Sequence, residues 1–351
     1  MTRKPFFLLS MLLLGAACVL LFLVTTAGRP NDNSNGFARQ GLHGHKAIYR
    51  HELAVGETLY KICGATAHRF FFTGRDPRVM HPADFGLKRL APQTIPFPLS
   101  NQVLVAYDIK VDSPYVRLYA NNLSTIYSSR FDDTSIHSTR LPTRLFTAIV
   151  PLSAQCVVAR AFDSSGEHQL FKKIYAGASK PAIETTILAY NNDAGFSADG
   201  MLRYDSSTHR ILFVQFYQNR FFCLDTNLHL IYTGKTIDTT NTNPVSTRHL
   251  PSRPNKGSLL PDVPLHIINW ACTTDGRYIY IQSTLKADNE LAPEFEKNAV
   301  VDVYNLSNGR YRRSFYIPDL HNEKAQNLFF VNGLLLVSYT GYIGAFEIPD
   351  R

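Results

Sequence analysis

The residues of this chain best suited to chemistry are its cysteines, acidic residues and histidines. Four cysteines lie beyond the apolar N-terminal stretch, far apart and each among apolar neighbours: Cys63, Cys156, Cys223 and Cys272. No two of them form a CxxC pair, the usual spacing of zinc and redox sites. Because a lone cysteine packs as a small hydrophobic residue, we expect buried free thiols. Disulfides, which an exported protein can form, are the alternative.

Acidic residues are the second group, because two carboxylates about 5 to 9.5 Å apart can hydrolyse a glycosidic bond. The candidates are Asp108, Asp112, Asp132, Asp133, Asp193 and Asp199. Nearly all stand beside Asn, Ser or Gly at the expected ends of strands, where an Asp side chain stabilises a turn. Structural roles are therefore expected for them, and a catalytic pair is the alternative.

Familiar catalytic and ligand-binding motifs are missing from the sequence. It contains no GxSxG, GxGxxG, GxxxxGK[ST] or HExxH pattern. His43 and His45 have no Cys or carboxylate nearby, and residues 190–200 lack the ligand spacing of a calcium loop. We therefore expect neither a cofactor nor a bound metal.

The charge of the chain is basic, with a formal net charge of +8. Such a balance can attract nucleic acid, anionic lipid or acidic polymers. The positive residues are dispersed, however, and their densest group, residues 310–313, adjoins a turn. Positive charge there suits an exposed strand edge, so we expect no nucleic-acid partner.

The elements that must position these residues are short strands, because β-branched and aromatic residues are plentiful and turn residues recur throughout. Hairpin-like segments lie at residues 81–97, 116–131, 159–175, 221–237 and 301–317. Apolar strands typical of burial on both faces lie at residues 67–75, 101–109, 154–162, 208–216, 275–283 and 332–340.

Together these segments predict repeated four-stranded units, which is the pattern of a β-propeller. The units lie near residues 54–97, 99–134, 143–178, 195–240, 265–319 and 325–351. The last unit has only three strands. Residues 45–51 could supply the fourth and close the ring, because a closed ring leaves no open sheet edge.

In this strand pattern, residues 45–351 resemble the six-bladed β-propellers of the TolB-like and NHL-like kind. The fold expected is thus all-β, a six-bladed propeller preceded by one N-terminal transmembrane helix. The resemblance implies a ligand or partner surface at the mouth of a central channel and no particular chemistry. A two-sheet sandwich and a seven-bladed ring are the alternatives.

The N-terminus has the pattern of a membrane anchor. Residues 6–27 carry no charge and would span a hydrocarbon core of about 30 Å as a helix. Arg3 and Lys4 precede the span, which predicts a cytoplasmic segment 1–5 and an exported remainder. Residues 28–44 are polar and predict a flexible tether to a propeller domain at 45–351. Cleavage near residues 25–28 and lipidation of Cys18 are the alternatives.

Some polar and aromatic residues are expected at one rim of the channel, where loops distant in sequence converge. They are Arg75, Asp76, Arg78, Tyr190, Asn191, Asp193 and Trp270. The function expected is binding of an envelope protein or a small ligand without catalysis, at a bacterial inner membrane and facing the periplasm. An exported enzyme acting on a glycan and a structural subunit of an envelope complex are the alternatives.

Overall fold

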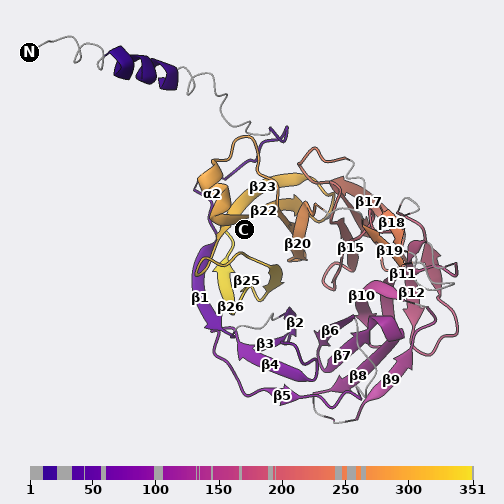
Figure 1. The fold of residues 1–351 in the computed structure, drawn as a ribbon. Helices are drawn as coiled ribbons and strands as arrows, with labels where there is room; N and C mark the ends of the chain where they lie inside the picture. The colour runs from indigo at the N-terminus through magenta and orange to yellow at the C-terminus, as the bar shows by residue number, and fades with distance from the viewer. Residues whose placement is uncertain are drawn as a thin grey trace, which may run out of the picture.

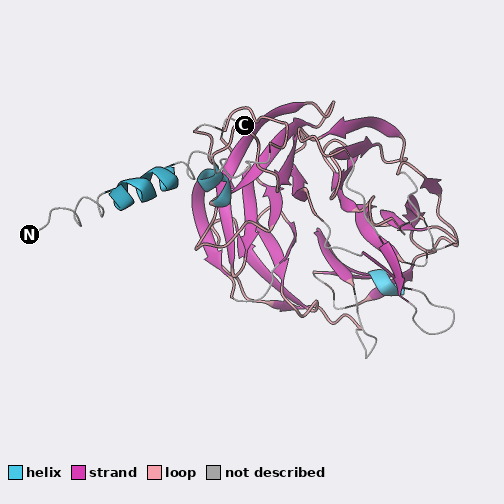
Figure 2. Ribbon diagram, turned by 45° about the horizontal axis from the view of Figure 1, so that its top comes forward, coloured by secondary structure: helices cyan, strands magenta, loops and turns pink. Residues whose placement is uncertain are grey.

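The computed structural model describes residues 11–21, 34–42, 44–56, 61–98, 106–131, 133, 135–143, 145–165, 168–188, 193, 195–241, 247–250, 258–261 and 266–349. Strands make up most of the body, with a 3-10 turn at Asn121–Leu123 and the short helix α2 at Ala292–Glu296 (Figure 2). Residues 11–21 form a helix apart from the strands.

Three sheets are simple antiparallel meanders of four strands in chain order. The first has β10 (Phe146–Ser153), β11 (Cys156–Phe162), β12 (Gln169–Tyr175) and β13 (Ile183–Thr185). The second has β14 (Gly200–Asp205), β15 (Arg210–Gln215), β16 (Arg220–Leu224) and β17 (Leu230–Lys235). The third has β20 (Asn269–Thr274), β21 (Tyr278–Ser283), β22 (Asn298–Asn305) and β23 (Tyr311–Pro318).

Two further meanders are joined edge to edge into an eight-stranded sheet. One has β2 (Lys61–Ala65), β3 (Arg69–Thr73), β4 (Val79–Asp84) and β5 (Gln93–Thr94). The other has β6 (Tyr107–Asp112), β7 (Tyr115–Ala120), β8 (Thr125–Arg130) and β9 (His137–Arg140). They meet where β2 and β6 pair in parallel, with Gly64 opposite Val111. A Cβ atom on Gly64 would lie 2.3 Å from the Val111 carbonyl oxygen, so only glycine permits this approach.

The last sheet joins the two ends of the propeller domain. It contains β24 (Asn327–Val331), β25 (Leu334–Tyr339), β26 (Tyr342–Glu347) and, as its outer strand, β1 (Ile48–Ala54). β1 runs antiparallel to β26, from Ile48 opposite Glu347 to Ala54 opposite Tyr342. The strand expected at 45–51 is thus confirmed with a small shift. Residues 45–47 instead bond to the edge of β23, where Ala47 N–H donates to the Tyr316 carbonyl at 2.7 Å.

The sheets follow one another in a ring, in chain order (Figure 1). Buried apolar clusters join neighbouring meanders; one, for example, places Leu212 and Val214 of β15 against Ile279 and Ile281 of β21. Another joins the last sheet to the first, through Ile343 and Phe72 among others. The described chain therefore has an all-β, propeller-like fold, in which the first and last strands pair and close the ring. A small separate hairpin pairs β18 (Thr247–Leu250) with β19 (Ser258–Pro261).

The apolar strands expected from sequence are, with one exception, the second strand of a meander. Residues 208–216, for example, contain β15, and residues 275–283 contain β21. The exception is the segment 101–109, of which only residues 106–109 are described. There the innermost strand is β6, and the deeply buried second strand is β7. The pattern misleads here because β7, with the sequence YVRLYA, reads equally well as the start of a hairpin.

Part of the segment expected as a flexible tether, residues 34–42, packs against the body. Phe37, Arg39 and Leu42 are buried. Arg39 bonds to Asp302 of β22, and Leu42 packs on Val300 and Tyr316. A polar, glycine-rich segment gave no sign of this because the docking depends on isolated side chains, such as Arg39 and Leu42, and on partners distant in the sequence.

Most of the proposed membrane anchor at residues 6–27 lies outside the described residues, which include only its helical part, 11–21. Across the described ranges, no helix combines the length and apolar character needed to cross a bilayer.

Candidate functional site

The loops of the ring are sorted onto two faces by the alternation of strand direction. Each meander starts at the strand nearest the ring axis and continues outward by antiparallel neighbours. Connections between second and third strands therefore lie on the same face as the connections between sheets. We call this the connection face. Arg75, Asp76 and Arg78, between β3 and β4, and Asp193, between β13 and β14, lie on it.

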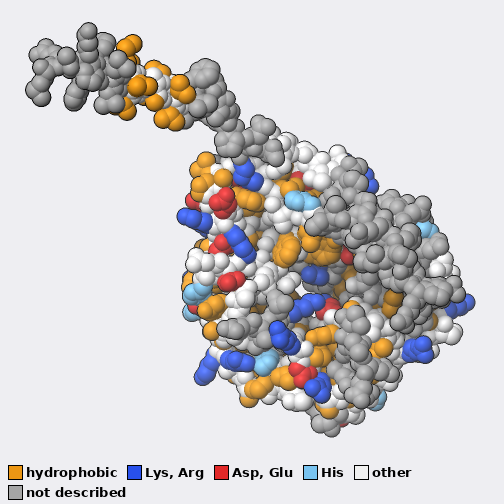
Figure 3. All heavy atoms as spheres, viewed as in Figure 1, with side chains coloured by type: hydrophobic (Ala, Val, Ile, Leu, Met, Phe, Trp, Pro, Cys, Tyr) orange, Lys and Arg blue, Asp and Glu red, His pale blue; other side chains and the backbone are white. Residues whose placement is uncertain are grey.

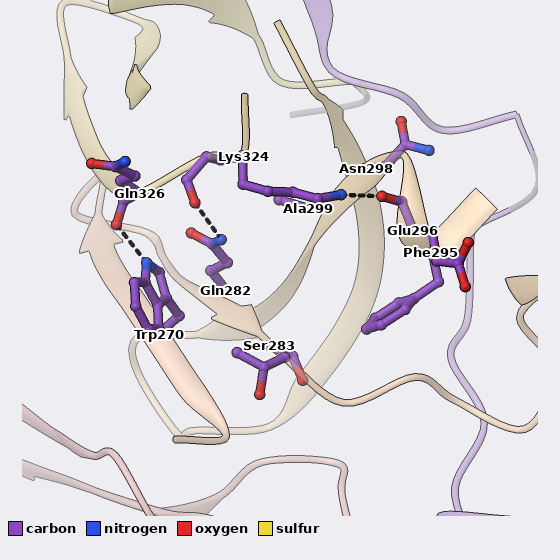
Figure 4. A pocket seen from close by; sticks show the side chains of 11 residues that line it. Trp270, Gln282, Ser283, Phe295, Glu296, Asn298, Ala299, Lys324 and Gln326 are labelled. Atoms are coloured by element: carbon purple, nitrogen blue, oxygen red, sulfur yellow. Dashed lines mark hydrogen bonds between the residues drawn. The ribbon is translucent and has the colours of Figure 1, made fainter. Parts of the chain in front are cut away.

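A cavity of about 670 Å³ opens on the connection face, between the sheet β20–β23 and the sheet that starts with β24. We call it the Trp270 pocket. Its walls come from the start of β20, the end of β21, helix α2 and the segment before β24 (Figure 4). Its lining residues include Trp270, Gln282, Phe295, Asn298, Ala299 and Ala325. The volume lies within the range of about 300–1,000 Å³ typical of small-ligand sites.

Trp270 is the single tryptophan of the chain and forms one wall of this pocket. The residue is 43% exposed, and its indole N–H donates to the Gln326 carbonyl at 2.8 Å. That bond fixes the ring, whereas a large part of its apolar surface stays open. An exposed indole in a concave site is typical of a binding surface, since aromatic residues dominate binding energy.

Several polar groups around the Trp270 pocket are held by hydrogen bonds and ion pairs within the protein. The Gln282 amide N–H donates to the Ala325 carbonyl at 2.9 Å, and the Asn298 amide donates to the Glu294 carbonyl at 2.6 Å. Lys324 pairs with Asp319 at 2.7 Å and also bonds to the Glu296 carbonyl (Figure 4). The Gln282 side-chain oxygen, in contrast, is buried without a hydrogen-bond partner among the described residues. The pocket therefore offers a largely apolar surface with an open acceptor, suited to an aromatic or aliphatic group.

A second cavity, of about 480 Å³, is the central channel of the ring. It is lined by residues of the innermost strands β2, β6, β10, β14, β20 and β24. Lys and Arg side chains are visible at this central opening (Figure 3). Lys61 and Lys110 both pair with Asp108, at 2.7 Å and 3.1 Å.

The pKa values of Asp108 and Lys110 are set by burial and by the charges beside them. Burial alone would raise the pKa of Asp108, but Lys110 and Lys61 outweigh it and hold the pKa at about 2. Burial lowers the pKa of the Lys110 ammonium, and its cationic neighbours Lys61 and Arg203 add to this against the opposing effect of Asp108. An Asp ionised at every ordinary pH cannot donate a proton, so Asp108 is unsuited to general acid catalysis.

The other acidic residues of the channel are also engaged. Asp112 pairs with Arg117 at 2.9 Å. Asp205 accepts hydrogen bonds from the hydroxyl groups of Ser207 at 2.6 Å and Thr208 at 2.9 Å. Both carboxylates therefore have partners within the protein.

The expected rim residues that the structure describes make separate local contacts. Asp76 accepts three hydrogen bonds from Arg78, a local and exposed pair that lowers the pKa of Asp76. Arg75 contributes its carbonyl oxygen to the Tyr107 hydroxyl. Asp193 is buried and accepts bonds from the backbone of Gly195 and Ser197, so its role is to shape a turn.

Of the expected rim residues, Trp270 alone lines the described pocket on the connection face. Tyr190 and Asn191 lie outside the described residues. Sequence reasoning missed Phe295 and the channel cations Lys61 and Lys110. The available signals were an apolar residue within the charged loop EFEK, and charged residues within otherwise apolar inner strands.

The cysteines are free thiols, as expected. Cys63, Cys156, Cys223 and Cys272 are all buried and unpaired by disulfides. Burial raises the pKa of the Cys63 thiol to about 12, so it is not a nucleophile at neutral pH. Within the described ranges, no three His, Cys, Asp or Glu side chains gather in a way that could hold a metal ion.

Comparison with known proteins gives the fold and not a family. The sequence matches no protein-family model and no curated protein. Similar solved structures include a member of the DUF4221 family from Bacteroides vulgatus, 13% identical, with a TM-score of 0.52 over 87% of this chain and 99% of that one. A streptogramin B lyase structure is 11% identical, with a TM-score of 0.50 over 86% and 98%. These are β-propellers, and the fold of this chain is a β-propeller.

Proposed function

We propose that this protein is a membrane-anchored, extracytoplasmic β-propeller of six blades that binds a protein partner or small ligand without catalysis. The observation that carries the proposal is the apolar cavity of about 670 Å³ beside the exposed face of Trp270. Rim pockets of this kind bind through shape and apolar contact, whereas catalysis requires convergent reactive groups.

The blade count is supported by the strand order of the described residues. Four sheets have four strands each, and the eight-stranded sheet consists of two meanders of four, which gives six units. The last unit is completed by β1, so first and last segments share one blade.

The membrane setting is supported by the sequence alone. The uncharged stretch 6–27 and the flanking Arg3 and Lys4 favour an anchor with the propeller outside the cytoplasm. A bacterial inner membrane, with the propeller in the periplasm, fits a chain of this pattern. The partner would then be an envelope protein or a small ligand of that compartment.

An exported enzyme of the glycan hydrolase or lyase type is the second candidate. One observation favours it, because Lys61 and Lys110 converge in the central channel, where an acidic substrate could bind. The ionised state of Asp108 and the pairing of Asp112 with Arg117 count against an acid–base pair there. The binding function therefore accounts for more of the described geometry.

Partner recovery from solubilised membranes tests the proposed function. Trp270→Ala removes the aromatic wall of the pocket, and we expect it to abolish recovery of partners that the unaltered protein retains. Arg78→Ala is the matched control, because Arg78 is exposed on the same face but outside the pocket. Equal recovery with both variants would contradict binding at the Trp270 pocket.

A small ligand would give a different readout. Because Trp270 is the single tryptophan, its fluorescence reports on this pocket alone. A ligand in the pocket should shift the emission to shorter wavelength and protect the indole from a soluble quencher. Arg78→Ala should leave both effects unchanged.

A further inference from the structure

The N-terminal segment 34–42 bonds to a loop of the connection face, residues 284–297, which joins β21 to β22. Asp288 of this loop accepts hydrogen bonds from the Ser34 hydroxyl at 2.9 Å, the Asn35 backbone N–H at 2.8 Å and the Gly36 backbone N–H at 3.1 Å. The Asn35 amide also donates to the Lys286 carbonyl at 2.8 Å. Residues 34–36, which follow the proposed anchor in the sequence, thus contact this loop directly.

A buried ion cluster locks the attachment. Arg39 is only 3% exposed; it bonds to Asp302 at 2.8 Å and pairs with Glu290 of the same loop. Arg39 and Asn289 also bond reciprocally, backbone N–H to side-chain oxygen at 3.0 Å and side-chain amide to carbonyl at 2.9 Å. Removing a buried cation from two carboxylates is costly, so the attachment is a fixed part of the fold.

The length of chain before this attachment limits how far the loop can lie from the proposed membrane anchor. The uncharged stretch ends at residue 27, and the attachment starts at Ser34. A fully extended chain over that interval reaches at most about 25 Å. Loop 284–297 must therefore lie near the bilayer surface whenever the anchor is inserted.

The loop presents an apolar side chain beside the attachment. Leu291 is 68% exposed, the largest exposed fraction among the large hydrophobic residues of the described propeller domain. Hydrophobic side chains are visible at this corner of the molecule, where α2 lies in Figure 1 (Figure 3). Three of the four acidic residues of the loop are engaged: Glu290 with Arg39, Glu294 with Lys46 at 3.1 Å, and Asp288 with the Ser34 hydroxyl. The fourth, Glu296, is exposed.

We propose that loop 284–297 is a membrane-contact surface, with Leu291 inserted at the bilayer interface. The inference rests on the proposed anchoring of residues 6–27. Phe295 and Glu296 of the same loop line the Trp270 pocket, so this contact turns the pocket toward the bilayer. The occupant of the pocket would then arrive along the membrane surface.

Site-specific fluorescence on the full-length protein in vesicles of phosphatidylcholine and phosphatidylglycerol tests this surface. Leu291→Cys carries an environment-sensitive dye such as NBD, in a chain with Cys18→Ser; the remaining cysteines are buried. Ser307→Cys is the matched control, because Ser307 is exposed at the opposite end of β22. Eight residues of β22 separate the two faces by about 26 Å.

We expect the dye at position 291 to emit at shorter wavelength than the dye at position 307. Lipids carrying a nitroxide near the headgroup should quench most of the emission from position 291. The dye at position 307 should emit as in water and should not be quenched. Equal, water-like emission at both positions, in protein that floats with the vesicles, would overturn the membrane-contact surface and leave the anchor standing. Protein that does not float with the vesicles would overturn both.

Discussion

Asp108 links two neighbouring meanders of the ring through its ion pairs. Both of its carboxylate oxygens are occupied, one by Lys61 and one by Lys110. These two cations come from β2 and β6, the strands whose parallel pairing joins two meanders. Protonation of Asp108 would leave the two ammonium groups facing each other without an anion.

The free energy of unfolding should therefore fall at acid pH as Asp108 becomes protonated. Its folded-state pKa of about 2 lies below the ordinary value of 3.8, so its contribution is complete above that value and is lost as the pH falls through about 2. The shift corresponds to about 2 kcal/mol. Urea unfolding in detergent should show Asp108→Asn less stable by this amount at neutral pH, with the difference vanishing at the acid end.

Asp76→Asn is the control for that titration, since Asp76 is in an exposed pair with Arg78. Such pairs contribute at most about 1 kcal/mol. A difference between the unaltered protein and Asp108→Asn that stays constant from neutral to acid pH would contradict the ion cluster.

Among the elements, the N-terminal segment 34–42 and the closing strand β1 differ from ordinary blade strands because they precede the repeats they complete. The segment is held by the Arg39 cluster, and β1 by its ladder with β26. The segment thus packs on the sheet β20–β23, and β1 becomes the outer strand of the last sheet. The loop 284–297 receives this attachment and also forms a wall of the Trp270 pocket.

Arg39→Leu should destabilise the protein by about 3 kcal/mol, because it leaves Glu290 and Asp302 buried without their cation. Arg50→Leu is the matched control, because Arg50 pairs with Glu347 on the surface and should cost less than about 1 kcal/mol. Chemical unfolding followed by Trp270 fluorescence measures both. Equal effects of the two substitutions would show that the segment is not docked through Arg39.

The ring could be predicted from the sequence because the features that determine it are local and recur along the chain. Turn residues and apolar strands recur along the chain, and the missing strand of the last unit pointed to the segment before the first. The Trp270 pocket could not, because Trp270, Gln282, Phe295 and Ala325 meet only through the folded arrangement of two sheets. Trp270 itself was found because an isolated tryptophan beside an inner strand suggests a binding surface. The docking of Arg39 could not be predicted, because a single buried arginine creates no repeating pattern in the sequence.

The channel cations show the same limit. Lys61 and Lys110 lie on inner strands of different meanders, and only the ring brings them to one carboxylate. Their presence in otherwise apolar strands was visible, but their shared partner was not. The strand pattern therefore predicts the fold, whereas a functional site depends on which side chains the fold brings together.

Closure of the ring by β1 is tested most directly by cysteine pairs across the β1–β26 ladder. Ile48 lies opposite Glu347 and Ala54 opposite Tyr342, so cysteines at either matched pair should form a disulfide on mild oxidation, identified by mass spectrometry of the linked peptides. The crossed pairs, Ile48→Cys with Tyr342→Cys and Ala54→Cys with Glu347→Cys, lie about 20 Å apart along the ladder and should remain reduced. Disulfides in the crossed pairs, or in neither set, would contradict the closed propeller.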